Sequence, residues 1–186
     1  DHVYHLAFIN GTEFFYTKPE LVMDVGIRGH FNVLDACIRH DVALFVYASS
    51  SEVYQTPAVI PTPEDVPGVV PDVSNPRYSY GGSKLIAELL TLHYAGKTTM
   101  KRIIFRPHNI YGPAMGFEHV IPQIVGKIFR ASRALQQKAA QITIQGTGEE
   151  TRAFCYIEDA VRGILIAAEK GQNEHVYHVG SEQETP

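Results

Sequence analysis

The chain of 186 residues lacks several features that would point to other classes of protein. It has only two cysteines, Cys37 and Cys155, far apart in apolar contexts, so we expect two buried thiols and no disulfide. Its net charge of −4 provides no basic surface for nucleic acid or an anionic membrane. No apolar run approaches the roughly 20 residues that cross a bilayer, and no secretory leader opens the sequence. We therefore expect a cytoplasmic protein with neither nucleic acid nor membrane as its partner.

The sequence does contain the alternating pattern of an α/β protein, with 45% hydrophobic and 19% charged residues. β-rich runs predict strands over 3–7, 43–48, 102–106, 141–145 and 175–179, with extended chain over 153–156. Helical spacing of apolar residues predicts helices over 19–40, 78–95, 120–135 and 158–170. Because 43–48 is continuously apolar, it is typical of a central strand covered on both faces. The order predicts a doubly wound, mostly parallel sheet.

The segment 56–76 contains six prolines and is expected to be a long surface loop, which in a compact domain is usually functional. A second loop is predicted over 107–116. The tetrapeptide HVYH occurs at 2–5 and at 175–178. Both copies lie in predicted strands, where residues three apart point to opposite faces. Neither copy is therefore predicted to bind a metal.

Polar side chains follow three of the predicted strands. They are the groups His5-Leu6-Ala7, Ser49-Ser50-Ser51-Glu52 and Arg106-Pro107-His108-Asn109. In an open parallel sheet, ligands bind beyond the carboxyl ends of the strands. One such group would be an ordinary turn, but three on one edge indicate an active site.

Tyr80 and Lys84 are spaced to lie on one face of the predicted helix 78–95. An ammonium beside a phenol favours the phenolate, so Lys84 is expected to lower the pKa of Tyr80 and make it an acid or base. Ser50 could bond to the same substrate hydroxyl. Gly81 and Gly82 in a first helical turn cost about 1 kcal/mol each relative to Ala, which indicates a close approach to the backbone. The other interpretation is a tyrosine packed on the sheet and a solvated lysine.

These motifs, taken in order, resemble the extended short-chain dehydrogenase/reductases, specifically the NAD-dependent nucleotide-sugar epimerases and dehydratases. The matching segments are DHVYHLA (1–7), GHFNVLDAC (29–37), VYASSSEVY (46–54), NPRYSYGGSK (75–84), RPHNIYGP (106–113), GTGEETRAFCYIEDA (146–160) and VYHVG (176–180). Each is modest alone, but together they cover nearly the whole chain at the family's spacings. The fold that the resemblance implies is Rossmann-like.

The resemblance also implies roles for individual residues. Ser50, Tyr80 and Lys84 would be catalytic, with Lys84 also holding the nicotinamide ribose of NAD. The cofactor would further contact Leu6, Ala7 and Pro107. The sugar or its phosphate would contact Ser51, Glu52 and Asn109, and Arg152 would pair with the diphosphate, for which a guanidinium is well shaped. A surface ion pair of Arg152 with Glu149 or Glu150 is the alternative.

The sequence departs from the family at several positions. The glycine-rich fingerprint and the strand before it are missing, because neither 26–29 nor 146–150 joins a first strand to a helix. Gly26 stands where many members carry an Asn that supports the cofactor site, and Gln55 stands where Gly is usual. We therefore expect a fragment whose sheet is incomplete at its N-terminal half. A non-catalytic fragment that cannot hold NAD is the alternative from another functional class.

The family's reactions begin alike, with Tyr80 removing a hydroxyl proton while hydride leaves C4 of the sugar for NAD. Dehydratases carry an Asp where this chain has Ser51, and serine is a poor acid. The run Ser50-Ser51-Glu52 resembles uronate decarboxylases, but an epimerase needs only the tyrosine, the lysine and room for the keto-sugar to rotate. We expect an epimerase acting on a nucleotide-diphosphate sugar, with decarboxylation or 4,6-dehydration as alternatives.

Two expectations concern organisation. Residues 1–113 would be the later part of the NAD-binding domain with its catalytic residues, and 114–186 would mix substrate-binding and returning Rossmann elements. The resemblance also implies a homodimer through helices 19–40 and 78–95. In agreement with it, Ile27, Val33, Ile86 and Leu90 extend the apolar character of these helices beyond one stripe.

Overall fold

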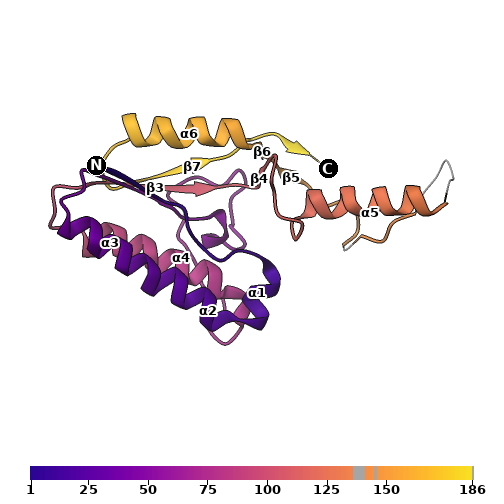
Figure 1. Cartoon of the computed structure of the whole chain (residues 1–186), viewed down its shortest axis with the longest axis horizontal. Helices are drawn as coiled ribbons and strands as arrows, with labels where there is room; N and C mark the ends of the chain where they lie inside the picture. The colour runs from indigo at the N-terminus through magenta and orange to yellow at the C-terminus, as the bar shows by residue number, and fades with distance from the viewer. Residues whose placement is uncertain (136–140, 145, 186) are drawn as a thin grey trace.

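The computed structural model describes residues 1–135, 141–144 and 146–185 (Figure 1). Its strands are β1 (His2–His5), β2 (Leu44–Ala48), β3 (Lys101–Pro107), β4 (Ile110–Tyr111), β5 (Arg152–Ala153), β6 (Cys155–Tyr156), β7 (His175–Val179) and β8 (Glu184–Thr185). Its α-helices are α1 (Thr12–Thr17), α2 (Pro19–Met23), α3 (His30–Arg39), α4 (Ser79–Leu89), α5 (Val120–Leu135) and α6 (Ile157–Lys170). Two π-helical segments, Asp24–Gly29 and Leu90–Tyr94, continue α2 into α3 and extend α4.

Four parallel strands form the main sheet in the order β1-β2-β3-β7. This confirms the predicted Rossmann-like α/β fold with its mostly parallel sheet. The carboxyl ends of the four strands lie at the same edge of the sheet, as the sequence analysis requires for a site. Two short pairs lie outside this sheet, β4 with β6 in parallel and β5 with β8 in antiparallel.

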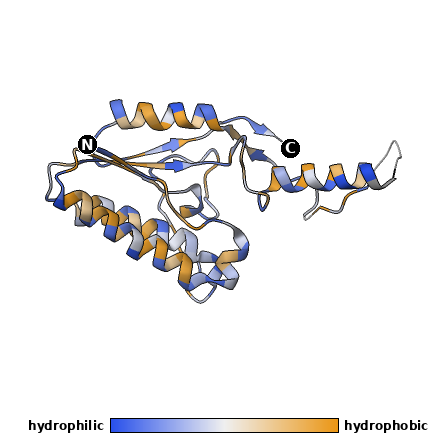
Figure 2. Cartoon of the chain, viewed as in Figure 1, coloured by the Kyte–Doolittle hydropathy of each residue, from blue (hydrophilic) through white to orange (hydrophobic). Residues whose placement is uncertain are grey.

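A hydrophobic core lies on each face of the sheet. On one face, Phe45 and Tyr47 of β2 pack with Leu34 of α3 and Ala87 of α4. On the other face, strand residues such as Val46 and Ile103 pack with alanines of α6. Figure 1 shows α6 on one side of the sheet and α2 to α4 on the other. Figure 2 shows that the strands between them combine hydrophobic stretches with hydrophilic residues near their ends. Cys37 and Cys155 are buried free thiols, one in each core, as expected.

The predicted helices and main strands are found within a few residues of their expected bounds, with three differences. The short helix α1 was not predicted, because its sequence is rich in aromatic residues that favour strands. The predicted strand 141–145 is wrong over 141–144, which pair with no strand, and residue 145 lies outside the described residues. The predicted loop 107–116 contains the two-residue strand β4.

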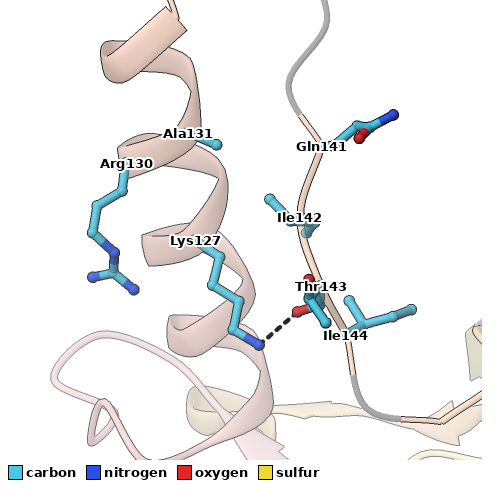
Figure 3. A pocket seen from close by; sticks show the side chains of 7 residues that line it. All are labelled: Lys127, Arg130, Ala131, Gln141, Ile142, Thr143 and Ile144. Carbon is cyan, nitrogen blue, oxygen red and sulfur yellow. Dashed lines mark hydrogen bonds between the residues drawn. The ribbon is translucent and has the colours of Figure 1, made fainter.

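The loop 56–76 has no helix or strand before the 3₁₀ turn at Pro76–Tyr78, as its prolines predict. Helix α5 extends beyond the end of the sheet, with the segment 141–144 beside it (Figures 1 and 3). Within the part of the chain that the structure describes, no helix is both long and apolar enough to cross a membrane.

Candidate active site

A cleft of about 440 Å³ opens at the carboxyl edge of the sheet, which we call the inner cleft. Its walls come from the turn after β1, the end of β2, the start of α4 and the segment after β3. Its polar lining includes Asn10, Thr12, Ser50, Ser51, Glu52, Tyr80, Asn109, Glu118 and His119. The structure therefore brings five of the predicted site residues together with Pro107, which also lines the cleft.

Ser50 and Tyr80 form the deepest polar part of the inner cleft, and each side chain is 7% exposed. Ser50 lies two residues after the end of β2 and is the N-cap of the 3₁₀ turn Ser51–Val53. Its hydroxyl accepts a hydrogen bond from the Glu52 N–H at 3.1 Å. Tyr80 lies in the first turn of α4. A phenol and a hydroxyl that face one cleft can hold and exchange the proton of a substrate hydroxyl.

The Tyr80 ring lies between two phenylalanines. Phe15 of α1 stacks on it with centroids 4.8 Å apart, and Phe8 meets it edge-on at 5.0 Å. Burial raises the pKa of Tyr80 to about 12, while the Ser50 side chain acts in the opposite direction. The phenol is therefore protonated at neutral pH in this arrangement.

Lys84 lies one helical turn after Tyr80 and is almost fully buried. Its amine donates a hydrogen bond to the Ala48 carbonyl at 2.7 Å and lies 3.9 Å from the centroid of the Phe8 ring. Burial lowers the pKa of Lys84 to about 7, although Glu88 raises it somewhat. The expectation that Lys84 lowers the pKa of Tyr80 is wrong in this arrangement, because desolvation leaves the amine only partly charged and raises the pKa of the phenol.

Glu52 is held by Arg77, whose Nη2 donates to both carboxylate oxygens at 3.0 and 2.8 Å. This pairing holds the carboxylate as a fixed acceptor in the lining of the cleft. The expected close approach at Gly81 is confirmed: a Cβ there would lie 2.6 Å from Gln55 Nε2 and 3.0 Å from the Glu52 carbonyl. At Gly82 the expectation is wrong, because an added Cβ would meet only Val70 at 3.5 Å.

Asn109 follows β3 with φ +42°, a left-handed conformation that asparagine tolerates, and donates to the Ala153 carbonyl at 3.3 Å. Arg152 lies farther out, in an adjoining outer cleft of about 650 Å³. The outer cleft shares Gly11, Thr12, Glu118, His119 and Val120 with the inner one and is also lined by Lys127. Among the described residues Arg152 forms no ion pair, so the alternative pairing with Glu149 or Glu150 is not observed.

Leu6 and Ala7 were predicted to line the cofactor, but neither lines the inner cleft. Strand β1 ends at His5, two residues earlier than predicted. Leu6 and Ala7 lie beyond it and are exposed, Leu6 by 57%. It is the next residue, Phe8, that reaches the site. His5 also belongs to the core and not to the site, since its ring stacks on Tyr47 with centroids 5.9 Å apart.

A buried polar network behind the cleft was missed by the sequence analysis. Glu88 of α4 accepts two hydrogen bonds from Arg106 of β3, at 2.9 and 2.6 Å, and one from the Ser49 hydroxyl. Arg106 also donates to the Tyr54 hydroxyl, which lies 2.6 Å from His178 Nε2 on β7. The network ties α4 to three strand ends. A glutamate one turn after Lys84 on an otherwise apolar helix face was the signal for it.

A separate groove of about 640 Å³ lies between α5 and the segment 141–144 (Figure 3). Lys127 reaches across it and donates to the Thr143 carbonyl at 2.8 Å. None of the predicted site residues lines this groove, so the site is assigned to the inner cleft.

Comparisons with known proteins identify the family of the chain. The model of the NAD dependent epimerase/dehydratase family matches residues 1–180. The chain is 28% identical to a dTDP-D-glucose 4,6-dehydratase of Dictyostelium discoideum, covering 99% of this chain and 42% of that protein. It is 32% identical to a UDP-N-acetyl-alpha-D-glucosaminuronate decarboxylase of Bacillus cytotoxicus, covering 99% of this chain and 55% of that protein.

Among solved structures, the fold resembles a UDP-glucose 4-epimerase of Thermotoga maritima in complex with UDP-glucose. The TM-score is 0.82 at 25% identity, over 99% of this chain and 56% of that one. The chain spans about half the length of the curated relatives it matches.

Proposed function

Because the chain belongs to the NAD-dependent epimerase/dehydratase family, we propose that its inner cleft is the catalytic centre of a nucleotide-sugar 4-epimerase. The observation that supports this choice is the set of groups around Tyr80. The polar lining offers a phenol, hydroxyls, amides and a histidine, and its two carboxylates are Glu52, paired with Arg77, and Glu118. Beside Ser50 and Tyr80 stands Ser51, where a dehydratase needs an acid.

In the proposed reaction, Ser50 and Tyr80 hold the C4 hydroxyl of the sugar. Tyr80 takes the hydroxyl proton. It returns the proton after the keto-sugar has rotated, so that the opposite face of C4 is turned toward the cofactor site. NAD, when bound, supplies the hydride acceptor and donor for this step. Asn109 and Ser51 orient the sugar within the inner cleft, and Arg152 of the outer cleft pairs with the diphosphate. A phenol with a pKa of about 12 stays protonated at neutral pH. In this proposal the Lys84 ammonium, 5.5 Å from the Tyr80 ring centroid, favours the phenolate once Lys84 carries its full charge.

The residues present fit the nicotinamide ribose of NAD in their chemistry. The Lys84 amine has three N–H groups, and among the described residues one carbonyl, that of Ala48, accepts from it. The two remaining donors match a pair of ribose hydroxyls. Pro107 at the end of β3 lines the inner cleft and would contact the nicotinamide ring.

Uronate decarboxylation is the second candidate, and two observations favour it. The run Ser50-Ser51-Glu52 resembles that of decarboxylases, and a decarboxylase is among the relatives at 32% identity. Electrostatics favour the epimerase, because the described lining of the inner cleft contains Glu52 and Glu118 but no lysine or arginine to receive a sugar carboxylate.

We also infer a homodimer through the face of α2 to α4 that points away from the sheet. Met23, Phe31 and Ile86 are between 37% and 44% exposed there. Val33 and Leu90, which were expected to contribute, pack partly against the core instead. Residues 114–186, which include α5 and the outer cleft, would provide much of the substrate contact.

The test is to incubate the full-length protein with a panel of neutral and uronic nucleotide sugars and follow them by proton NMR. The proposal expects 4-epimers of a neutral sugar. Loss of CO₂ from a uronic sugar would support the second candidate, and loss of water would overturn both. Absence of turnover and of NAD binding would favour a non-catalytic protein.

A further inference from the structure

The Phe8 ring covers the two groups on which the proposed chemistry depends. Its centroid lies 3.9 Å from the Lys84 amine and 5.0 Å from the Tyr80 centroid. Phe8 belongs to a small cluster of apolar residues with Phe15 and Val22, apart from the two cores of the sheet. A neutral ring at this distance stabilises a buried ammonium but offers it no hydrogen-bond acceptor.

The ring fits there because residue 26 is a glycine. A Cβ at Gly26 would lie 2.5 Å from Phe8 Cζ and 2.9 Å from the Ser83 Cβ, so any side chain would collide with the ring and with α4. Gly26 lies in the π-helical segment Asp24–Gly29, which packs against α4. The family resemblance places an Asn at this position in many members. Phe8 and Gly26 are therefore a matched pair, in which the ring fills the space that a larger residue would take.

The position of the ring has a direct consequence for Lys84. Lys84 is 3% exposed, and its amine has its one described acceptor, the Ala48 carbonyl, on the side of the strand. Ribose hydroxyls could reach the two remaining N–H groups only after the ring has moved. Phe8 itself is only partly buried and follows β1 in a segment without regular structure, so a change of rotamer exposes it to the cleft without unfolding an element.

We propose that Phe8 is a gate over Lys84, closed in this structure, which swings aside when the nicotinamide ribose binds and which thereby sets the affinity for the cofactor. This inference rests on the proposed function, because it assumes that NAD occupies the inner cleft. Affinity is reduced by the fraction of molecules in which the gate is closed, so removing the ring should strengthen binding. Opening also returns water to Lys84, which restores its charge beside Tyr80.

The first measurement needs no cofactor. In the full-length protein, acetylation of Lys84 by trace acetic anhydride is followed by peptide mass spectrometry in wild type, Phe8→Ala and Phe8→Leu. The reaction is run at about pH 11, where even a hydrated lysine is mostly the neutral, reactive amine. We expect labelling at this pH to rise about tenfold in Phe8→Ala, because the ring no longer covers the amine, and less in Phe8→Leu. Phe117→Ala, at a ring that is 83% exposed and lies outside both clefts, is the matched control and should leave labelling unchanged.

The second measurement is the dissociation constant of NAD by calorimetry on the same proteins. The gate predicts binding about tenfold tighter in Phe8→Ala than in wild type, with Phe8→Leu between them. Unchanged labelling, or unchanged or weaker NAD binding in both folded variants, would overturn the gate. If wild type binds NAD and the variants bind it equally, the gate alone fails. If neither wild type nor any variant binds NAD while Lys84 labelling rises in Phe8→Ala, both the gate and the proposed function fail.

Discussion

At the scale of single residues, the buried amine of Lys84 couples the site to the stability of the protein. The unfolded chain holds its proton up to about pH 10.5, whereas the folded protein releases it near pH 7. Between these values the unfolded state binds more protons, so Lys84 contributes stability that increases with pH. Below pH 7 the folded protein holds the Lys84 ammonium out of water, and the contribution of Lys84 to stability is at its least favourable.

We therefore predict how stability changes when Lys84 is replaced. The free energy of unfolding of wild type minus that of Lys84→Met should rise between pH 7 and pH 10 by up to about 4 kcal/mol. Urea denaturation at several pH values measures it. Lys170→Met, at the end of α6, controls for the loss of a lysine as such. A difference that does not change with pH would show that Lys84 is hydrated in solution.

The sequence predicts the proposed catalytic pair, Tyr80 and Lys84, but not its electrostatics. Tyr80 and Lys84 follow from a spacing of four on a helix, and Ser50 from its place after a strand. The pKa directions depend on Phe8 and Phe15, which come from a turn and a short helix whose positions no local pattern indicates. Arg152 and Asn109 were predicted by resemblance, and the structure places them in neighbouring clefts without showing their role.

At the scale of elements, the Glu88–Arg106 pair fixes α4 against β3, and both side chains are less than a tenth exposed. Breaking one member of a buried pair leaves an unpaired charge, which costs about 3–5 kcal/mol. We predict a loss of this size in unfolding free energy for Glu88→Met, with much of it recovered in the double variant Glu88→Met, Arg106→Met.

The exposed pair of Arg28 and Asp24 is the matched control for this cycle. Asp24→Asn should change the unfolding free energy by less than about 1 kcal/mol. A similarly small effect of Glu88→Met, or a double variant as unstable as the sum of the single ones, would contradict the coupling of α4 to the sheet through this pair.

The elements themselves were predictable where one pattern dominates. Residues 44–48 and 175–179 are β-rich runs of ordinary strand length, and 120–135 shows helical spacing throughout, so these bounds agree closely. The π-helical segment Asp24–Gly29 was not predicted, because its residues fall within the helical spacing of 19–40 and leave no separate signal. The two-residue strands β4, β5, β6 and β8 are too short to leave a periodic signal.

At the scale of the whole molecule, the two faces of the sheet differ in what covers them. The helices α2 to α4 present Met23, Phe31 and Ile86 outward on one side, and α6 presents Leu165 on the other. We predict that Ile86→Glu in the full-length protein converts a dimer into a monomer at micromolar concentration, because a carboxylate would be buried in the interface. Sedimentation velocity gives the mass of each species.

The matched control is Leu165→Glu, since Leu165 is 53% exposed on the opposite side of the sheet. This variant should remain dimeric if the interface is formed by α2 to α4. A monomeric wild type would contradict the dimer altogether. If only Leu165→Glu dissociated the dimer, the interface would be assigned to α6 and not to α2 to α4.

The measurement that tests the central claim most directly is the turnover of Tyr80→Phe in the full-length protein, on whichever nucleotide sugar the panel identifies. The account predicts that kcat/KM falls by at least about 100-fold, because the phenol is the proton carrier beside Lys84, while the melting curve stays close to that of wild type. Tyr4→Phe, at an exposed tyrosine of β1, should retain full activity. Retention of more than roughly a tenth of wild-type activity by Tyr80→Phe would contradict the assignment of the inner cleft as the catalytic centre.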